Sequence, residues 1–517
     1  MGLVRTIYYC LKLRHNDKQH VGKIQRIQRR NLQRAVRYAK SHSPFFRDLY
    51  KDVDPDSPDF SVRSLPPVTK DDMMENFDSV VTDPRLNLEE VREWTRDRGK
   101  LGRMFKRKYI VTHTSGTTGM PAYFVYSRKE WDWIQALSVT RGIRYKPSFI
   151  DFWRHAVWVL FHRTRVALIS VLGGHFVTYL LFLVTPKIAR KLSRFEFLSV
   201  VKPVPELVAR LNQLDPHVLH CYPTMLEILA HEQLEGRMNI KPWLISSSSE
   251  PLTPTARRRI ERAFPKSPIY ETYGTTEGIT LASECHHHSA MHVNTDHYIL
   301  ESVKDDGSPV EPGQAGDKVY LSCLFMRTMP LLRYELTDVT IPLAEPCDCG
   351  LPFPLVKVRG RTDDIFWVYD QHKQPVALPP IPFEAMLLEI DGMRQYQLVQ
   401  EERNRLMVYF RPNDDADPAE VQGQIRKQFD RFLHEKQLVD CLQVGIQQVE
   451  DIQRDPKSGK IRQIFSRVER LYLPGVPLGE RRSGEDRRLA RDKKLQGERR
   501  SRQRRTDEDE DEEGEEQ

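Results

Sequence analysis

Cysteine is scarce in this sequence, which has seven cysteines in 517 residues, an odd number. The start, MGLVRTIYYCLKLRHN, also lacks the pattern of a secretory signal. Both absences argue against a secreted protein stapled by disulfides. We therefore expect a cytoplasmic protein whose thiols stay reduced.

Long hydrophobic runs are also rare. One run, VALISVLGGHFVTYLLFLV at 166–184, has nineteen residues without Asp, Glu, Lys or Arg, close to the roughly 20 residues that cross a bilayer. A Gly-Gly-His sequence interrupts its middle and both flanks are basic, so it carries no orientation signal. We expect a buried strand, a glycine turn and a buried helix, with no integral membrane span; a surface-associated segment is the alternative.

A large charge of one sign is missing as well. The formal net charge is +7, and residues 480–505 contribute twelve Lys/Arg against five Asp/Glu before nine acids in TDEDEDEEGEEQ. The body is therefore only mildly basic, which suits anionic substrates such as ATP or CoA and is poor evidence for nucleic-acid binding. Because the tail at 474–517 has almost no apolar residues, we expect it to be disordered, with no readable partner.

The length favours at least two domains. Short apolar strands alternate with helical patterns between 150 and 345, which predicts an α/β fold with a parallel sheet. Two strands, LMVYF and LQVGIQQV, flank a helical pattern later in the chain and predict a small α+β domain. We expect a large domain at 1–360, a small mobile domain at 361–473 and the tail at 474–517.

Two helices are indicated near the start of the chain. Apolar residues fall at helical spacing between Lys23 and Tyr50, in a run that stops at the proline of HSPFFRDLY. The segment LPPVTKDDMMENF predicts a second helix, capped by Thr69 with acids in its first turn.

The loop THTSGTTGMPAYF lacks the lysine of a Walker loop. Its glycines let the backbone approach an anion, and its hydroxyls add donors. The candidate phosphate-binding residues are Thr114, Ser115, Gly116, Thr117, Thr118 and Gly119. Taken alone, the same residues also fit a plain turn.

Four further motifs follow in order: YETYGTTEG, LLRYELTDV, VRGRTDDIF and RDPKSGKIRQIF. With this series the chain resembles the adenylate-forming superfamily of acyl-CoA synthetases, adenylation domains and luciferases. HSPFFRDLY and LPPVTKDDMMENF are similar to the phenylacetate-CoA ligase branch, including members associated with capsule and exopolysaccharide biosynthesis. The resemblance covers about residues 25–472 and implies a large AMP-binding domain and a small mobile one.

The resemblance implies a role for each matching residue. TSGTTG would wrap the β and γ phosphates, Tyr273 with Gly274 would face adenine, and Ser248, Ser249 and Glu250 would line its pocket. Thr276 would touch the α phosphate and Glu277 would hold Mg²⁺. The remaining roles are ribose binding by Asp338 and Arg361, a hinge at Asp363, and the catalytic cation at Lys460, which would replace the lysine missing from the loop.

The implied activity is ATP-dependent carboxylate activation through an acyl-AMP, followed by thioester formation with CoA. Alternatives are transfer to a carrier protein or a sugar of a surface polysaccharide, and a nucleotide-binding protein without turnover. Two departures from the family pattern are Met120 and Ala122 in place of lysines beside the loop, and Thr337 in place of glycine before Asp338. The acid, the acceptor and a homodimeric state stay open.

A second group of residues has the composition of a metal site. Cys285 precedes His292 by seven residues, and Cys347 and Cys349 follow. Three thiolates and an imidazole fit a closed tetrahedral zinc site, and the resemblance implies a structural one. The alternatives are a polar His-rich loop, or a ligand among His286–288 in place of His292. The turn Gly173–Phe176 and Tyr222 are further candidates, for an acyl pocket.

Overall fold

The computed structural model describes residues 2–114, 121–144, 163–172, 174–185, 191–200, 202–359, 366–373, 375–378, 380–387, 390–453 and 464–468. The chain divides into two compact units, Met1–Arg470 and Leu471–Gln517. All described residues belong to the first unit, so the predictions for the tail at 474–517 lie outside them.

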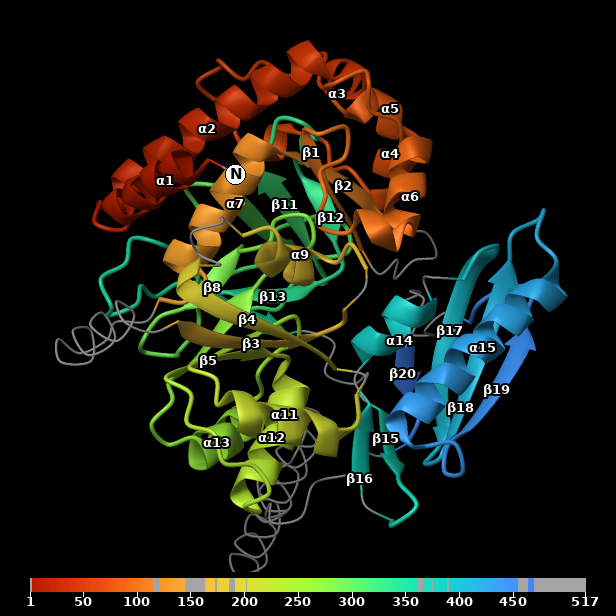
Figure 1. Cartoon of the computed structure of the whole chain (residues 1–517). Helices are drawn as coiled ribbons and strands as arrows, with labels where there is room; N and C mark the ends of the chain where they lie inside the picture. Colours follow the sequence, from red (N-terminus) through yellow and green to blue (C-terminus); the bar gives the residue numbers. More distant parts are fainter. Residues whose placement is uncertain are drawn as a thin grey trace, which may run out of the picture. The chain divides into compact units, whose positions relative to one another are not determined.

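A nine-stranded sheet in the order β13-β14-β9-β8-β7-β6-β5-β3-β4 forms the centre of the large body (Figure 1). Its parallel strands are β3 (Thr164–Ser170), β4 (Ser193–Ser199), β5 (Val218–Cys221), β6 (Leu244–Ser248) and β7 (Ile269–Tyr273). The antiparallel strands are β8 (Ala282–Glu284), β9 (Met291–Val293), β14 (Leu355–Arg359) and β13 (Val339–Pro342). The predicted parallel sheet is therefore extended by strands that no helix separates.

Helices alternate with the parallel strands, as predicted, and those from β4 onward are α11 (Val204–Leu214), α12 (Pro223–Leu234) and α13 (Pro254–Ala263). Their apolar faces share one core with the sheet, which includes Leu211, Leu229, Ile260, Leu219 and Ile245. This packing holds the ends of β5, β6 and β7 in fixed positions beside one another.

The run at 166–184 forms strand β3 and helix α9 (Val177–Leu183). The strand is buried as predicted, but Leu180 is the one residue of α9 that is fully buried. The helix predicted in this run is present, but the prediction that it is buried is wrong, because one side of α9 lines a pocket. Within the described ranges, no helix has the length and apolarity needed to span a membrane.

Within residues 2–114, six α-helices precede strand β1: α1 (Leu3–Asn16), α2 (Val21–His42), α3 (Pro44–Leu49), α4 (Lys70–Glu75), α5 (Phe77–Val80) and α6 (Leu88–Arg96). Helix α2 ends before Pro44, as the sequence indicated, and Ser43 caps α3. Thr69 caps α4 through a reciprocal pair of bonds with Asp72. Helix α1 has no counterpart among the predicted elements.

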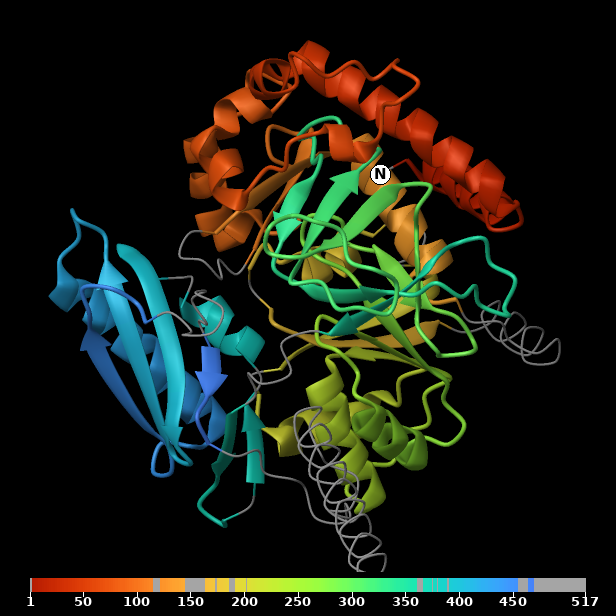
Figure 2. The same ribbon diagram turned by 180° about the vertical axis from the view of Figure 1, so that it is seen from behind.

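The remaining strands of the large body form two small sheets. One is the hairpin of β1 (Tyr109–His113) and β2 (Tyr123–Ser127), which leads into α7 (Arg128–Arg141). The other joins β10 (Tyr298–Val303), β11 (Lys318–Cys323) and β12 (Tyr334–Leu336). In both views α1 and α2 run along the outside of this body (Figures 1 and 2).

The C-terminal part contains β15 (Phe366–Tyr369), β16 (Pro375–Leu378), α14 (Pro380–Leu387), β17 (Met393–Glu402), β18 (Arg405–Pro412), α15 (Pro418–Lys436), β19 (Gln443–Gln448) and β20 (Ile464–Ser466). Four of its strands form a sheet in the order β19-β18-β17-β20. Its hydrophobic core draws every member from residues 366–464. The predicted strands LMVYF and LQVGIQQV and the helix between them are confirmed.

Candidate functional site

The hairpin β1–β2 holds the base of the glycine-rich loop. The Thr114 amide donates to the Ala122 carbonyl at 2.9 Å, and the Ala122 amide donates to Thr114 Oγ1, also at 2.9 Å. These two bonds join residues eight positions apart and close the loop at its neck. Ser115, Gly116, Thr117, Thr118 and Gly119 lie outside the described residues.

The segment that follows β7 folds back tightly on itself. A Cβ atom at Gly274 would lie 1.6 Å from the Ile279 carbonyl oxygen, so any larger residue would displace the backbone. The Thr276 carbonyl accepts a hydrogen bond from the Tyr126 hydroxyl of β2. The segment at 274–279 is thereby held against the hairpin that carries the glycine-rich loop.

Glu277 is a buried carboxylate in this segment, with 6% of its surface exposed. The pKa of Glu277 is raised to about 7, chiefly by burial and to a smaller extent by the Asp338 carboxylate, while hydrogen bonds, including one from Thr275, and the charge of Lys70 oppose the shift. Such a group stabilises a cation placed next to it, because the cation offsets the cost of burying the negative charge. Glu277 therefore fits the Mg²⁺ ligand that the resemblance implied.

The side chains of Tyr273 and Asp338 interact with one another. The pKa of the Tyr273 hydroxyl is raised well above its usual value, first by burial and then by the Asp338 carboxylate. Tyr273 ends β7, and Asp338 lies between β12 and β13. Two residues 65 positions apart, expected to face adenine and ribose, are thus brought together.

Lys70 is a cation that the sequence analysis did not assign to the site. Burial lowers the pKa of Lys70 to about 8, while Asp71 and Glu277 act in the opposite direction. The ammonium group therefore acts on the Glu277 carboxylate from the first residue of α4. The signal was present in LPPVTKDDMMENF, where this lysine follows the helix cap directly.

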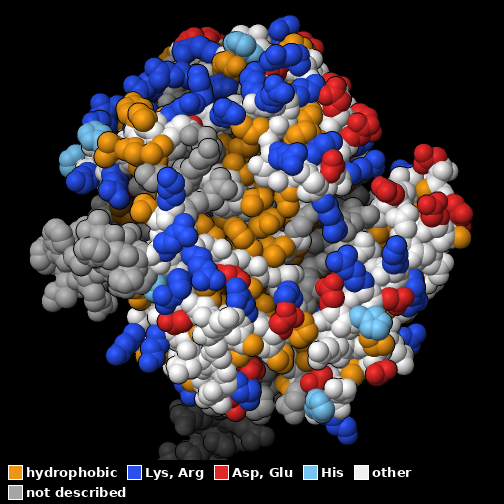
Figure 3. Space-filling model, viewed as in Figure 1, with side chains coloured by type: hydrophobic (Ala, Val, Ile, Leu, Met, Phe, Trp, Pro, Cys, Tyr) orange, Lys and Arg blue, Asp and Glu red, His pale blue; other side chains and the backbone are white. Residues whose placement is uncertain are grey.

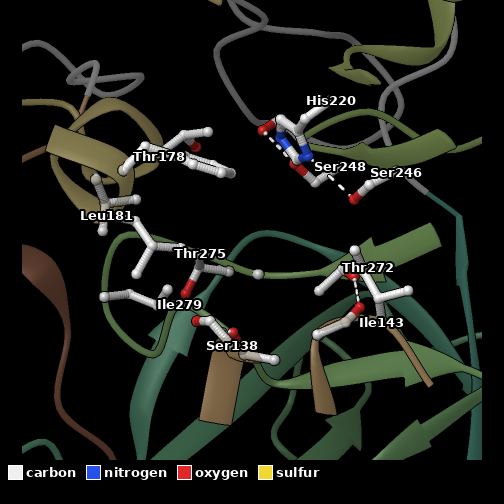
Figure 4. Close-up of a pocket in the computed structure, with 16 residues that line it drawn as sticks. Ser138, Ile143, Thr178, Leu181, His220, Ser246, Ser248, Thr272, Thr275 and Ile279 are labelled. Carbon is white, nitrogen blue, oxygen red and sulfur yellow. Dashed lines mark hydrogen bonds between the residues drawn. The ribbon is translucent and has the colours of Figure 1, made fainter. Parts of the chain in front are cut away.

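A pocket opens beside the segment at 274–279 (Figure 4). Its volume is about 120 Å³, which is similar to engineered apolar cavities of about 150 Å³ that hold benzene. Apolar walls come mainly from α9 and from two isoleucines, and polar groups come from the ends of β5, β6 and β7. The residues that matter below are Val177, Leu181, Phe182, Ile143, Ile279, His220, Ser246, Ser248, Ser249 and Thr275.

His220 is the polar centre of this pocket. Its Nδ1 lies 3.0 Å from Ser246 Oγ, and its Nε2 lies 3.3 Å from Ser248 Oγ. Burial lowers the pKa of His220 to about 4, so the ring is neutral at physiological pH. A neutral imidazole held between two hydroxyls offers both a donor and an acceptor, and both serines line the pocket.

Two positions expected near the acyl pocket do not line this cavity. Among the described residues, the pocket is lined by α9 and not by Gly174–Phe176 of the preceding turn. Tyr222 is buried, and its hydroxyl accepts a hydrogen bond from the Val171 amide at 3.1 Å. Tyr222 thus joins the segment after β5 to the segment after β3, and it does not line the pocket.

The residues expected beside adenine lie at the end of β6. Ser249 lines the pocket together with Gly274 and Thr275. The Glu250 carboxylate accepts hydrogen bonds from the Thr224 hydroxyl at 2.7 Å and from the Thr224 amide at 3.2 Å. Glu250 therefore stabilises the first turn of α12 at the rim of the site.

The structure also brings together Cys285, His292, Cys347 and Cys349. Their ligand atoms all lie within 4.8 Å of one another. The Cys285 and Cys347 sulfurs are 3.6 Å apart, while a tetrahedral site with zinc–sulfur bonds of about 2.3 Å places its sulfurs about 3.8 Å apart. His286, His287 and His288 do not belong to this group.

The orientation of His292 fits a metal ligand. Its Nδ1 lies 3.1 Å from the Phe353 carbonyl oxygen, which can only accept a hydrogen bond, so Nδ1 carries the proton. The lone pair is then on Nε2, which faces the Cys349 sulfur at 3.2 Å. Fixing the tautomer through the second ring nitrogen is the usual way in which proteins hold a metal-binding histidine.

Arg361, Asp363 and Lys460 lie outside the described residues. Their expected roles in ribose binding, hinge motion and catalysis therefore stay predictions.

Comparisons with known proteins agree with this site. Residues 106–323 match the family model described as "AMP-binding enzyme". This stretch contains the β1–β2 hairpin, the pocket and the segment after β7. The match supports the resemblance to adenylate-forming enzymes for this part of the chain.

Two curated proteins and one solved structure illustrate the relationship. A phenylacetate-coenzyme A ligase of Thermus thermophilus is 28% identical over 45% of this chain, and the match spans about half of that ligase, 51%. Protein CapK of Staphylococcus aureus is 22% identical over 76% of this chain and 80% of its own length. A crystal structure of 2-hydroxyisobutyryl-CoA ligase with 2-HIB-AMP and CoA has a TM-score of 0.55 at 18% identity, covering 88% of this chain and 91% of that one. The last likeness shows the shared α/β fold.

Proposed function

We propose that the protein activates a carboxylic acid with MgATP, forming an acyl-AMP and pyrophosphate, and then transfers the acyl group to CoA. The observation that carries this proposal is the meeting of Tyr273, Glu277 and Asp338 beside a mainly apolar pocket, in a chain that matches the AMP-binding enzyme family over residues 106–323. A nucleotide and an acid would then lie side by side, with the acid in the pocket.

The nucleotide roles follow the positions of the residues. Tyr273 would face adenine, Asp338 would accept hydrogen bonds from ribose, and Thr276 would approach the α phosphate. Mg²⁺ on Glu277 would neutralise charge that develops on the phosphates. The predicted loop Ser115–Gly119, Arg361, the hinge Asp363 and the catalytic Lys460 complete the proposal, as does a small domain at 361–473 that turns between the two half-reactions.

Lys70 adds a second cation to this scheme. Bringing a carboxylate and a triphosphate together requires positive charge near both anions. Lys70 already interacts with Glu277 in the structure. We propose that Lys70, together with Lys460, supplies the positive charge that the glycine-rich loop does not provide because it has no lysine.

The pocket indicates the class of acid. Its apolar walls from α9 and the isoleucines favour a compact hydrocarbon or aryl group. Both ring nitrogens of His220 are occupied by Ser246 and Ser248, but each serine hydroxyl has hydrogen-bonding capacity beyond that one bond. Ser246 and Ser248 would therefore hydrogen-bond a hydroxyl or carbonyl on the acid, a contact that an acid without any polar substituent would not make.

The cluster of Cys285, His292, Cys347 and Cys349 is proposed to hold one structural Zn²⁺. Three thiolates and one imidazole fill a tetrahedral shell, leaving no open position for catalysis. The ion would join the β8–β9 turn to the segment before β14.

The test is pyrophosphate release by the full chain with MgATP and a panel of aryl, short branched and hydroxy acids, each with and without CoA. Adenylation predicts release that depends on one class of acid and is lost in Lys460→Ala but kept in the exposed control Lys266→Ala. AMP release that needs CoA supports thioester formation. If pyrophosphate is released but AMP release does not depend on CoA, the result would favour another acceptor. If the protein binds ATP but releases no pyrophosphate, the result would contradict turnover.

A further inference from the structure

Helix α1 exposes a row of large apolar side chains. They are Leu3 (37% exposed), Val4 (83%), Ile7 (50%), Tyr8 (60%) and Leu11 (60%). Spacings of three and four residues place them on one face of the helix. The opposite face, with Thr6, Leu13 and Asn16, is buried.

The inner face of α1 is firmly docked on α7 and on the turn between β9 and β10. The ring of Tyr9 stacks on Trp133 of α7 with centroids 4.0 Å apart. Asn16 Nδ2 donates to Asp296 Oδ2 at 2.8 Å, and the neighbouring Asp17 forms an ion pair with Arg141 at 2.9 Å. These contacts fix which side of α1 faces outward.

The apolar row is surrounded by positive charge. Residues 2–42 contain eleven Lys/Arg and one acid, Asp17, and that acid pairs inward with Arg141. The apolar face continues at its C-terminal end into Arg14, His15 and Lys18, which are all exposed. Figure 3 shows hydrophobic side chains over α1 with Lys and Arg around them along α1 and α2.

The cations of α1 and α2 also lie close to one another. Besides burial, which has the largest effect, Arg30 and Arg34 lower the pKa of Lys12. Repulsion between such neighbouring like charges destabilises the isolated protein, and an anionic partner would reduce it. An apolar face flanked by clustered cations is the pattern of a helix that lies in the interface of an anionic bilayer.

We propose that α1, together with the basic outer side of α2, is a docking surface for an anionic lipid bilayer. The apolar face of α1 would enter the boundary between headgroups and acyl chains, and the lysines and arginines would contact lipid phosphates. Helix α1 has 14 residues, about 21 Å of helix, which suits a helix lying in the plane of the membrane.

Two other occupants fit less well. Nucleic acid would account for the cations but not for five exposed apolar side chains. A second copy of α1 would cover the apolar face but would bring two strongly basic surfaces together. A bilayer with anionic headgroups satisfies both features at once. This surface is separate from the proposed active site and does not depend on its activity.

The test is co-sedimentation of the full chain with vesicles of phosphatidylcholine alone or mixed with phosphatidylglycerol, at low and high salt. We expect binding to the mixed vesicles that weakens with salt. The variant Val4→Gln/Ile7→Gln/Leu11→Gln should lower the partition coefficient at least about tenfold, and Arg30→Gln/Arg34→Gln should weaken binding at low salt. The control Leu234→Gln/Val439→Gln replaces two apolar residues that are each 46% exposed elsewhere, and should bind like the wild type.

All variants keep the basic segment 480–505, so binding caused by that segment stays constant across them. Circular dichroism and the thermal midpoint confirm that each variant is folded. The proposal is overturned if the protein ignores both kinds of vesicle, or if the α1 variant binds them as tightly as the wild type. It is also overturned if light scattering shows that this variant turns a dimer into a monomer without altering vesicle binding.

Discussion

The guanidinium of Arg141 and the carboxylate of Asp296 form an ion pair with Nη1 and Oδ1 2.6 Å apart, and both side chains are completely buried. Although burial opposes it, Arg141 and His297 hold the pKa of Asp296 well below its usual range. Asn16 donates to the same carboxylate. One buried charge pair therefore joins α1, the end of α7 and the turn between β9 and β10.

Replacing Arg141 should destabilise the protein strongly. In Arg141→Met the Asp296 carboxylate stays buried without its cation, and we expect the free energy of unfolding to fall by about 3–5 kcal/mol. Urea unfolding measures the change. The exposed pair Arg405–Glu402, 3.5 Å apart, gives the control Arg405→Met, with an expected change below about 1 kcal/mol. Equal effects of both substitutions would contradict the importance of the buried pair.

Lys70 should contribute to adenylation. In Lys70→Met the Glu277 carboxylate loses a neighbouring positive charge, and we expect the rate of pyrophosphate release to fall by about 10²-fold. Lys70→Arg should retain part of the rate because the charge is kept. Stopped-flow or coupled assays of release provide the measurement, with Lys266→Met as the exposed control. A rate for Lys70→Met equal to that of the control would remove this lysine from the site.

The cysteine cluster should bind zinc. We expect about one zinc per chain in the purified protein, and its loss in Cys349→Ser together with a lower thermal midpoint. Mass spectrometry of the metal content is the measurement. Cys441 lies outside the cluster, so Cys441→Ser should keep both the zinc and the midpoint. A metal content unchanged in Cys349→Ser would contradict the assignment.

His220 should make stability depend on pH. Its pKa falls from 6.5 to about 4 in the folded protein because burial disfavours the charged ring. The unfolded chain therefore binds the extra proton first, and stability present above pH 6.5 is lost as the pH falls toward 4. Between about pH 7.5 and pH 5 this costs about 2 kcal/mol. Urea unfolding at the two pH values measures this loss in the free energy of unfolding. The loss should be larger in the wild type than in His220→Gln by about 2 kcal/mol. Equal losses in the two proteins would contradict the prediction.

Much of the fold could be predicted because its signals are local. Alternating strands and helices between β5 and β7 have the expected periods, and Thr69 and Ser43 cap their helices as their side chains allow. The antiparallel strands β8, β9, β13 and β14 are three to five residues long, too short to give a clear period. Helix α1 was not predicted: its apolar residues have helical spacing, but most of them face outward and do not mark a side that packs in the core.

The candidate site shows the same division. Cys285, His292, Cys347 and Cys349 could be grouped from the sequence because thiolates and imidazole have few other uses at such spacing. Lys70 and His220 could not, since a lysine after a helix cap and a histidine within a strand are ordinary until burial and neighbours are known. The pocket wall formed by α9 depends on tertiary packing that no local pattern carries.

The bond between Asn16 and Asp296 also has a consequence for the order in which the chain acquires its structure. The two residues are 280 positions apart, so at about 5–20 residues per second a ribosome adds Asp296 roughly 15–55 s after Asn16. Helix α1 cannot reach its final position during that time. The apolar and basic side chains of 3–18 are therefore exposed on the nascent chain before the residues that hold α1 in place have been added.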